Sequence, residues 1–171
     1  ATDCGMVVCA AGHLHPAKTA VPSGCTAVGV LGKVTETGHG LILALQDAAE
    51  QTWNTINGWA SVTGYAGTEL KLLPDNDARG SNLTSYTKLG STTVSNWCVP
   101  QKSDYADIFT NLGSEKSDGY GKIYDSNTNA YLTTGVGGSK MYQTWTATNS
   151  DTDYGWSVGD TNWYPAAKTL K

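Results

Sequence analysis

The sequence predicts one globular domain that contains both β-strands and α-helices. Two apolar runs at residues 26–34 and 40–45 predict strands, and the spacing of apolar residues over 103–112 predicts a helix. A chain of 171 residues can bury a core of useful size. A hydrophobic content of 39% with six Trp and nine Tyr distinguishes it from a disordered chain. We place a lead-in segment at residues 1–25 and the domain at residues 26–171.

The strongest strand signal is the pair of runs Thr26–Val34 and Gly40–Leu45. The segment Thr35–His39 between them has the length of a hairpin turn, and Gly38 within it tolerates positive φ. Both runs are apolar at nearly every position, which is typical of a sheet covered on both faces. We therefore expect this hairpin at the centre of the fold.

Two segments predict helices. In residues 52–59, Thr52 can cap a short helix with Trp53 and Ile56 on one side. In the second, Ser103 can cap a helix that ends at Gly113. Its apolar residues follow the i, i+3, i+4, i+7 spacing: Tyr105, Ile108, Phe109 and Leu112. Residues 60–95 show no sustained period, and Asp75 and Asp77 within them are read as a solvated turn.

Charge and motif content exclude several functions. The net charge is −4 and charged residues make up 15% of the chain, so it lacks the cationic footprint of a nucleic-acid-binding protein. No run of eighteen apolar residues predicts a membrane span. The sequence offers no nucleophile with a spaced base and no phosphate loop. We expect neither an enzyme nor a cofactor.

The cysteines and histidines predict a disulfide and no metal site. Four cysteines allow three pairings, and a low-charge composition rich in Thr, Asn and Gly is typical of oxidising compartments, so we expect at least one disulfide. Small buried thiols are the alternative. His13 and His15 would point to the same side of a strand, but no third ligand is apparent. The cysteines are Cys4, Cys9, Cys25 and Cys98.

The C-terminal region has the composition of a contact surface. Trp145, Trp156 and Trp163 are separated almost entirely by Thr, Ser, Asn, Asp, Gly and Tyr, the mixture found in paratope loops. We expect Trp145 and Trp156 to be buried framework with a ten-residue loop between them. The candidates for ligand contact are Tyr142, Gln143, Asn149, Asp151, Asp153, Tyr154, Asp160, Trp163 and Tyr164. The alternative is that Trp163 and Tyr164 pack onto the sheet and that the acidic residues form solvated turns.

Several segments resemble bacterial C-type-lectin-like domains. Trp97-Cys-Val-Pro100, which leads into a helix, is similar to the Trp-x-Leu-Pro element of that family. Tyr142-Gln-Thr-Trp145-Thr-Ala-Thr148 resembles its Tyr-Trp-Ser-Ser-Thr segment, and Gly155-Trp156-Ser-Val158 its Ala-Trp-x-Val strand. Gly40–Asp47 and Trp53 also match. The resemblance covers residues 26–168.

The resemblance implies an α+β fold in which two helices flank a small mixed or antiparallel sheet with long loops. Trp97, Pro100, Trp145 and Trp156 would be its structural framework. The calcium-binding triplets of sugar-binding C-type lectins are absent, so no calcium-dependent sugar site is expected. The family also continues into a final strand beyond residue 169, which suggests either that the sequence here lacks its last strand or that a strand-donating partner or a second copy pairs with the open sheet edge.

One branch of this fold comprises the variable proteins of diversity-generating retroelements, in which adenine-directed mutagenesis randomises C-terminal positions. An Asn codon ending in a pyrimidine can yield Tyr, Asp, Asn, Ser, Thr, Ala or Gly in this way. Met141 and Gln143 are incompatible with that template. The compatible positions are Tyr142, Thr144, Asn149, Asp151, Asp153, Tyr154, Ser157, Asp160, Asn162 and Tyr164.

The sequence therefore favours an extracellular ligand-binding or adhesin module, on a cell surface or a phage particle, that binds a protein or a glycan. A structural subunit of a pilus or fibre is the first alternative. An enzyme related to formylglycine-generating oxidases is the second, but those enzymes use a late pair of reactive cysteines and only Cys98 lies beyond residue 25 here.

Overall fold

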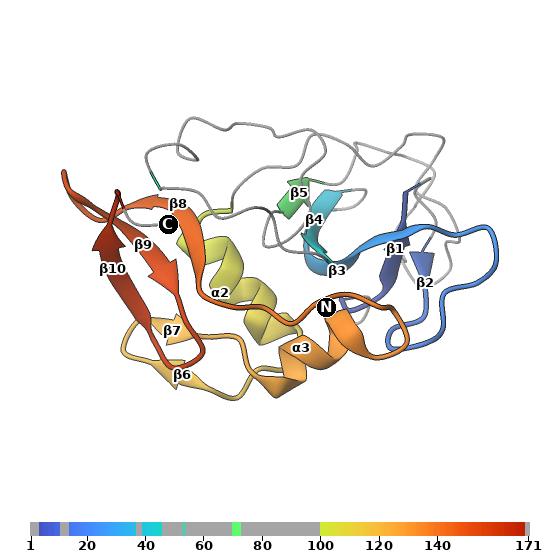
Figure 1. Ribbon diagram of the computed structural model, residues 1–171. Helices are drawn as coiled ribbons and strands as arrows, with labels where there is room; N and C mark the ends of the chain where they lie inside the picture. The colour runs from blue at the N-terminus through green and yellow to red at the C-terminus, as the bar shows by residue number, and fades with distance from the viewer. Residues whose placement is uncertain are drawn as a thin grey trace.

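The computed structural model describes residues 4–10, 14–36, 39–45, 53, 70–72 and 100–169, and these residues form an α+β architecture (Figure 1). Within these ranges the strands form a five-stranded sheet in the order β2-β1-β3-β4-β5, a three-stranded sheet in the order β10-β9-β8, and the hairpin β6-β7, and all neighbouring strands are antiparallel. The strands are β1 (Val7–Cys9), β2 (Leu14–His15), β3 (Ala27–Glu36), β4 (His39–Ala44), β5 (Leu70–Leu72), β6 (Ser117–Asp118), β7 (Gly121–Lys122), β8 (Thr144–Asn149), β9 (Tyr154–Val158) and β10 (Trp163–Ala167), and the helices are α2 (Lys102–Asn111) and α3 (Ser126–Thr133).

The predicted hairpin is confirmed as β3 and β4, at the centre of the larger sheet. The pairing extends from Gly29 opposite Ala44 to Glu36 opposite His39, so the connection is shorter than the predicted turn. Because neighbouring residues of a strand point to opposite faces, Val30 and Leu31 join two different apolar clusters. The expectation that both faces of this sheet are covered is confirmed.

The boundary predicted at residue 25 is not a structural boundary. Strand β1 pairs with β3, with Val7 opposite Val30, and both side chains are buried in the same cluster. A disulfide joins Cys9 at the end of β1 to Cys25, just before β3. The expectation of at least one disulfide is therefore confirmed. The short run around Val7 and Val8 was obscured by the small and polar residues on either side of it.

Helix α2 forms as predicted, but a distant residue caps it. Ser103 lies inside the helix, and the N-cap residue Gln101 makes no side-chain capping bond. The N–H of Lys102 instead donates to Oγ1 of Thr148 in β8 at 2.8 Å. At the other end Gly113 has a φ of +78°, and the N–H of Ser114 donates to the carbonyl of Phe109. This is the Schellman arrangement that a glycine after the last turn favours.

The apolar face of α2 is the centre of the larger cluster, with Tyr105, Ile108, Phe109 and Leu112 all at 0% exposure. Ile108 packs directly on Gly32 of β3, where an added Cβ would lie 2.8 Å from the isoleucine side chain. On the same helix, Asp104 and Asp107 both contact Lys33 of β3, at 3.3 and 2.6 Å. The hydrogen bond that Lys33 donates to Asp107 raises the pKa of Lys33 against the opposing effect of burial. These contacts fix α2 to the central hairpin.

Helix α3 was not predicted, because its buried residues Thr128 and Leu132 give almost no apolar period. Its start is set by Asp125, whose carboxylate accepts from four backbone N–H groups. Burial alone would raise the pKa of Asp125, but these bonds outweigh it and hold the pKa below its ordinary value of 3.8. The carboxylate thereby ties α3 to the segment that follows α2.

The first predicted helix is described at Trp53 alone, which is helical and 3% exposed; the remainder of residues 52–59 lies outside the described residues. Trp97, Cys98, Asp75 and Asp77 also lie outside them. Strand β5 occurs in the region for which no element was predicted.

We expect Asp125→Asn to reduce the free energy of unfolding by about 2 kcal/mol at neutral pH, because an amide nitrogen cannot accept from a backbone N–H. The folded-state pKa of Asp125 is depressed, so its contribution is complete above pH 3.8 and is lost as the pH falls through the folded-state value. Urea unfolding at several pH values should therefore show a weaker loss of stability on acidification for the variant than for the wild type.

Asp160→Asn, at an exposed position, is the matched control, with an expected change within about 0.5 kcal/mol. Parallel pH profiles of wild type and Asp125→Asn would contradict this account.

Candidate binding surface

The three-stranded sheet carries most of the residues predicted to contact a ligand. Strands β8 and β9 are joined by residues 150–153, so the ten-residue loop predicted between Trp145 and Trp156 is largely strand. The sequence signal that could have indicated this strand is the β-branched Thr at every second position, Thr144, Thr146 and Thr148, the first two of which are buried at 5% and 0% exposure. The sheet thus presents a short hairpin tip rather than a long loop.

One face of this sheet packs toward α2. Val158 of β9 lies directly opposite Trp163 of β10, so both side chains point to the same face. Both join the cluster around α2, and the rings of Trp163 and Phe109 are 6.1 Å apart. Both N–H groups of Trp163 are also satisfied internally: its backbone N–H donates to Asp118 and its Nε1–H to the carbonyl of Lys122.

The expectation that Trp163 contacts a ligand is therefore wrong. Its side chain is 2% exposed, and its indole is enclosed by α2 and the β6-β7 hairpin. The alternative drawn from the sequence, that Trp163 packs onto the sheet, describes the structure.

The other face of the sheet holds Trp53. An added Cβ on Gly155 would lie 2.4 Å from the Trp53 indole, so only glycine allows this close approach. Nε1 of Trp53 donates to the carbonyl of Thr146 at 2.8 Å. Trp145, Ser157 and Tyr164 lie side by side across the three strands on this same face. The indole of Trp53 thus fixes β8 and β9 relative to each other.

Toward the β8-β9 hairpin tip, the side of the sheet that faces α2 becomes exposed. Tyr154, Trp156 and Pro165 share this face, since Trp156 is opposite Pro165 and two residues from Tyr154. Tyr120, from the β6-β7 turn, packs on Trp156 with ring centroids 4.9 Å apart. Tyr120 is 62% exposed and Tyr154 43% exposed. We call these four residues, Tyr120, Tyr154, Trp156 and Pro165, the aromatic strip.

A lysine ammonium lies against the aromatic strip. Nζ of Lys102, in the first turn of α2, is 3.4 Å from the ring centroid of Trp156 and 4.3 Å from that of Tyr120. The buried ring of Trp163 is 5.5 Å away. Burial lowers the pKa of Lys102, and the charge of Asp118 opposes this effect. Three electron-rich ring faces offset the desolvation of the ammonium and join α2 to the sheet.

The tip of the β8-β9 hairpin adjoins the aromatic strip through Tyr154. Oδ1 of Asp151 accepts from the N–H groups of Asp153 and Tyr154, at 2.8 and 2.9 Å. Nζ of Lys168 donates to the carbonyls of Asp151 and Thr152. Asn149, Asp151, Asp153 and Tyr154 are all exposed, as predicted, on a backbone that these bonds hold in place.

The remaining predicted contact residues lie at the other end of the sheet. Tyr142, at 70% exposure, and exposed Gln143 precede Thr144, which pairs with Val158, and exposed Asp160 follows Val158. The five residues of β9 separate this end from the hairpin tip by about 13 Å. Tyr164 is half-buried on the Trp53 side. The predicted set is therefore two separate groups rather than one surface.

The predicted framework is found in part. Pro100 is buried, and its carbonyl accepts from the N–H of Ala147 in β8 at 2.8 Å. Trp145 and Trp156 are half-buried rather than buried. Trp156 differs from the expectation: among the described residues, Tyr120 and Lys102 pack on its ring and leave it half-buried.

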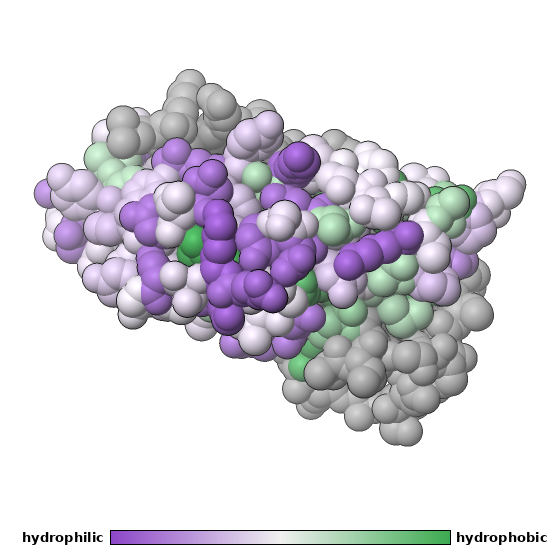
Figure 2. Space-filling view, turned by 90° about the horizontal axis from the view of Figure 1, so that it is seen from below, coloured by the Kyte–Doolittle hydropathy of each residue, from purple (hydrophilic) through white to green (hydrophobic). Residues whose placement is uncertain are grey.

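Three of the residues that make this surface were not identified from the sequence. Tyr120, Lys102 and Pro165 come from the β6-β7 turn, α2 and β10, and no local pattern connects them. Seen from below in Figure 2, the described surface around β6 and β7 is mostly hydrophilic, with apolar residues in small patches. A ligand on this side of the molecule would therefore meet single aromatic side chains and not a broad apolar area.

No protein-family model, no curated protein and no solved structure matches this chain. Among the described residues, no helix has the length and apolar character needed to cross a membrane.

We expect Lys102→Met, which keeps most of the side-chain volume and removes the charge, to reduce the free energy of unfolding by about 1 to 2 kcal/mol. Chemical denaturation monitored by Trp fluorescence measures this difference. Lys140→Met, at an exposed position, is the matched control and should change stability by less than about 0.5 kcal/mol. A Lys102→Met protein as stable as the wild type would mean that desolvation of the ammonium cancels its attraction to the rings.

Proposed function

We propose that this chain is an extracellular ligand-binding module, of the adhesin type. It binds a protein or a glycan through the aromatic strip and the β8-β9 hairpin tip. The observation that carries the proposal is the position of Tyr154, which is exposed where the two features meet. An exposed tyrosine and a half-buried tryptophan beside Asn149, Asp151 and Asp153 combine contact area with adaptable hydrogen bonds.

The rigidity of this surface supports binding. The hairpin tip is held by Asp151 and Lys168, and the aromatic strip by Lys102. Side chains on a preorganised backbone lose less conformational entropy when a ligand is bound. The Cys9–Cys25 disulfide supports an extracellular location, on a cell surface or a phage particle, because disulfides persist in oxidising compartments.

We also propose a C-type-lectin-like fold for the domain. Two of the segments that resemble this family, at Trp53 and Pro100, contact a third in β8, and so does the first residue of α2. Trp53 donates to Thr146, the carbonyl of Pro100 accepts from Ala147, and the N–H of Lys102 donates to Thr148. These contacts support a common framework in which a helix after the Trp-Cys-Val-Pro segment is fixed to the C-terminal strands.

A test of the binding function is to probe glycan and protein arrays with the purified chain and to measure the affinity of each hit for variants. Tyr154→Ala should weaken binding by about 30-fold, the effect of losing about 2 kcal/mol from a central aromatic contact. The melting temperature should stay unchanged, since Tyr154 is exposed.

Tyr142→Ala is the matched control, because it makes the same substitution at an exposed tyrosine on the opposite end of the sheet. Its affinity should equal that of the wild type. Equal losses in both variants would contradict the assignment of the site to the aromatic strip, and the absence of any ligand would favour the structural-subunit alternative.

The retroelement branch of the proposal predicts where sibling copies of this sequence differ. Compatible positions that are exposed should vary, and these are Tyr142, Asn149, Asp151, Asp153, Tyr154, Asp160 and Asn162. Thr144 and Ser157 are equally compatible by codon but are 5% and 1% exposed, so they should stay constant. Sequencing of sibling copies tests this. Substitutions spread evenly over the chain would contradict diversification and favour a pilus or fibre subunit.

A further inference from the structure

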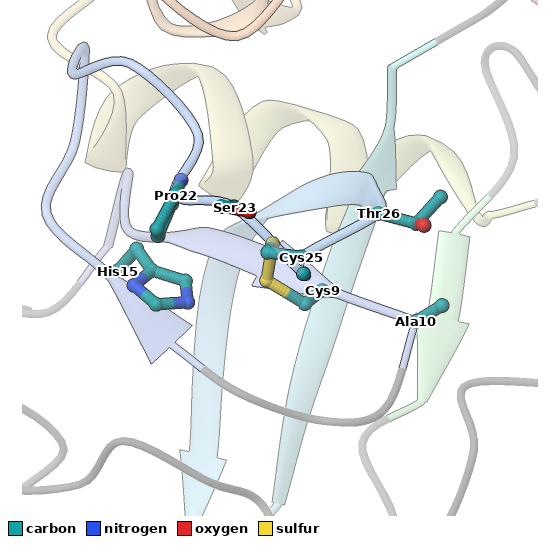
Figure 3. Close-up of a pocket in the computed structure, with 8 residues that line it drawn as sticks. Cys9, Ala10, His15, Pro22, Ser23, Cys25 and Thr26 are labelled. Carbon is teal, nitrogen blue, oxygen red and sulfur yellow. A yellow bond between two sulfur atoms is a disulfide. The ribbon is translucent and has the colours of Figure 1, made fainter.

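A second cluster of reactive side chains lies far along the chain from the proposed binding surface. Sγ of Cys9, Sγ of Cys25 and a ring nitrogen of His15 all lie within 4.8 Å of one another. Cys9 is 2% exposed, and Cys25 and His15 are half-buried. Figure 3 shows the imidazole of His15 on the same side of the pocket as the Cys9–Cys25 disulfide.

The strand register explains why these residues meet. His15 pairs with Val7, and Cys9 lies two residues after Val7 on the same face of β1, so His15 and Cys9 are diagonal neighbours across β1 and β2. Cys25 is brought to them by the pairing of β1 with β3, in which the N–H of Ala10 donates to the carbonyl of Thr26. Three separate segments thus converge on one point.

We propose that reduced Cys9 and Cys25, together with His15, form a zinc-binding site that the disulfide replaces on oxidation. Two thiolates and one imidazole are ligands that Zn²⁺ prefers, and a water molecule can complete the tetrahedron. Zinc–sulfur bonds of about 2.3 Å and zinc–nitrogen bonds of about 2.0 Å place the ligand atoms of a tetrahedron about 3.5 to 3.8 Å apart. Both sulfurs lie within 4.8 Å of a ring nitrogen of His15, and the two bonded sulfurs would separate on reduction.

The surroundings leave space for this change. A pocket of about 270 Å³ is lined by the three ligands and by the turn from Pro22 to Thr26, which is ample for an ion and its water. In that turn Gly24 has a φ of +85°, and apart from its chain neighbours no atom of the described residues lies within 4 Å of the position that a Cβ would take there. The turn is therefore open beside Cys25, and the proposal requires the Cys25 end to move by the distance that separates a disulfide from a zinc-bridged pair.

The conversion of the disulfide to the zinc-bound state balances in atoms and electrons. A dithiol reductant breaks the Cys9–Cys25 bond, is itself oxidised to a disulfide, and leaves two thiols on the protein. Zn²⁺ then displaces the two thiol protons and accepts the neutral imidazole nitrogen of His15. The disulfide joins β1 to the start of β3, and the zinc ion would join the same two segments and also β2, through His15.

Cobalt(II) is the probe for the test, because its absorption spectrum distinguishes tetrahedral thiolate coordination from hydration. The untagged chain is reduced with a phosphine and titrated with Co²⁺ without oxygen. We expect one equivalent of tetrahedral Co²⁺ that Zn²⁺ displaces, and no binding to the oxidised chain. Zn²⁺ should also raise the melting temperature of the reduced chain and leave that of the oxidised chain unchanged.

Variants locate the ion. Cys25→Ser should abolish binding and His15→Ala should weaken it by at least about tenfold. His15→Ala keeps the disulfide, so its folding can be checked in the oxidised state before reduction. Cys4→Ser and Cys98→Ser are matched controls that should bind as the wild type does. A reduced wild type that binds no Co²⁺, or one whose binding survives His15→Ala and Cys25→Ser, would overturn the proposal.

Discussion

The packing of α2 between two sheets is the constraint on which the rest of the structure depends. On one side Ile108 lies against Gly32, with no room for a Cβ, and Asn111 donates to the carbonyl of Gly32. On the other side Phe109 contacts Trp163. In Figure 1 the helix lies between the C-terminal strands and β3 and β4. Since protein cores are close-packed, neither sheet can shift without displacing this helix.

The position of the exposed aromatics follows from where α2 begins. Its buried residues cover the end of the C-terminal sheet that holds Val158 and Trp163. The helix starts at Lys102, whose ammonium reaches Trp156, so α2 itself has no earlier turn that could cover Tyr154. A cap supplied by Thr148 fixes that starting point to β8 itself. The three-stranded sheet presents the candidate surface. Through Thr148 it also fixes where α2 begins, and so how much of that surface the helix leaves exposed.

Local patterns predicted α2 and the β3-β4 hairpin, because their apolar spacing can be recognised within about ten residues. They could not place Trp163, because its burial depends on Asp118 and Lys122, more than forty residues earlier. The same limit applies to the candidate sites. Composition singled out Tyr154, whereas Tyr120 and Lys102 join it only through tertiary packing. A third metal ligand was sought beside His15 in sequence, but the cysteines reach it through strand pairing.

A surface that tolerates substitution needs a backbone that does not depend on its own side chains, and the hairpin tip meets this requirement in large part. Lys168 holds the tip through carbonyl oxygens, which every residue possesses. The exception is Asp151, whose carboxylate closes the turn onto Asp153 and Tyr154. Asn, Ser and Thr can form the same turn, and all three are products of an altered Asn codon. Under the proposed diversification, Asp151 would thus be restricted to residues that accept hydrogen bonds, while Asp153 and Tyr154 would vary without altering the path of the chain.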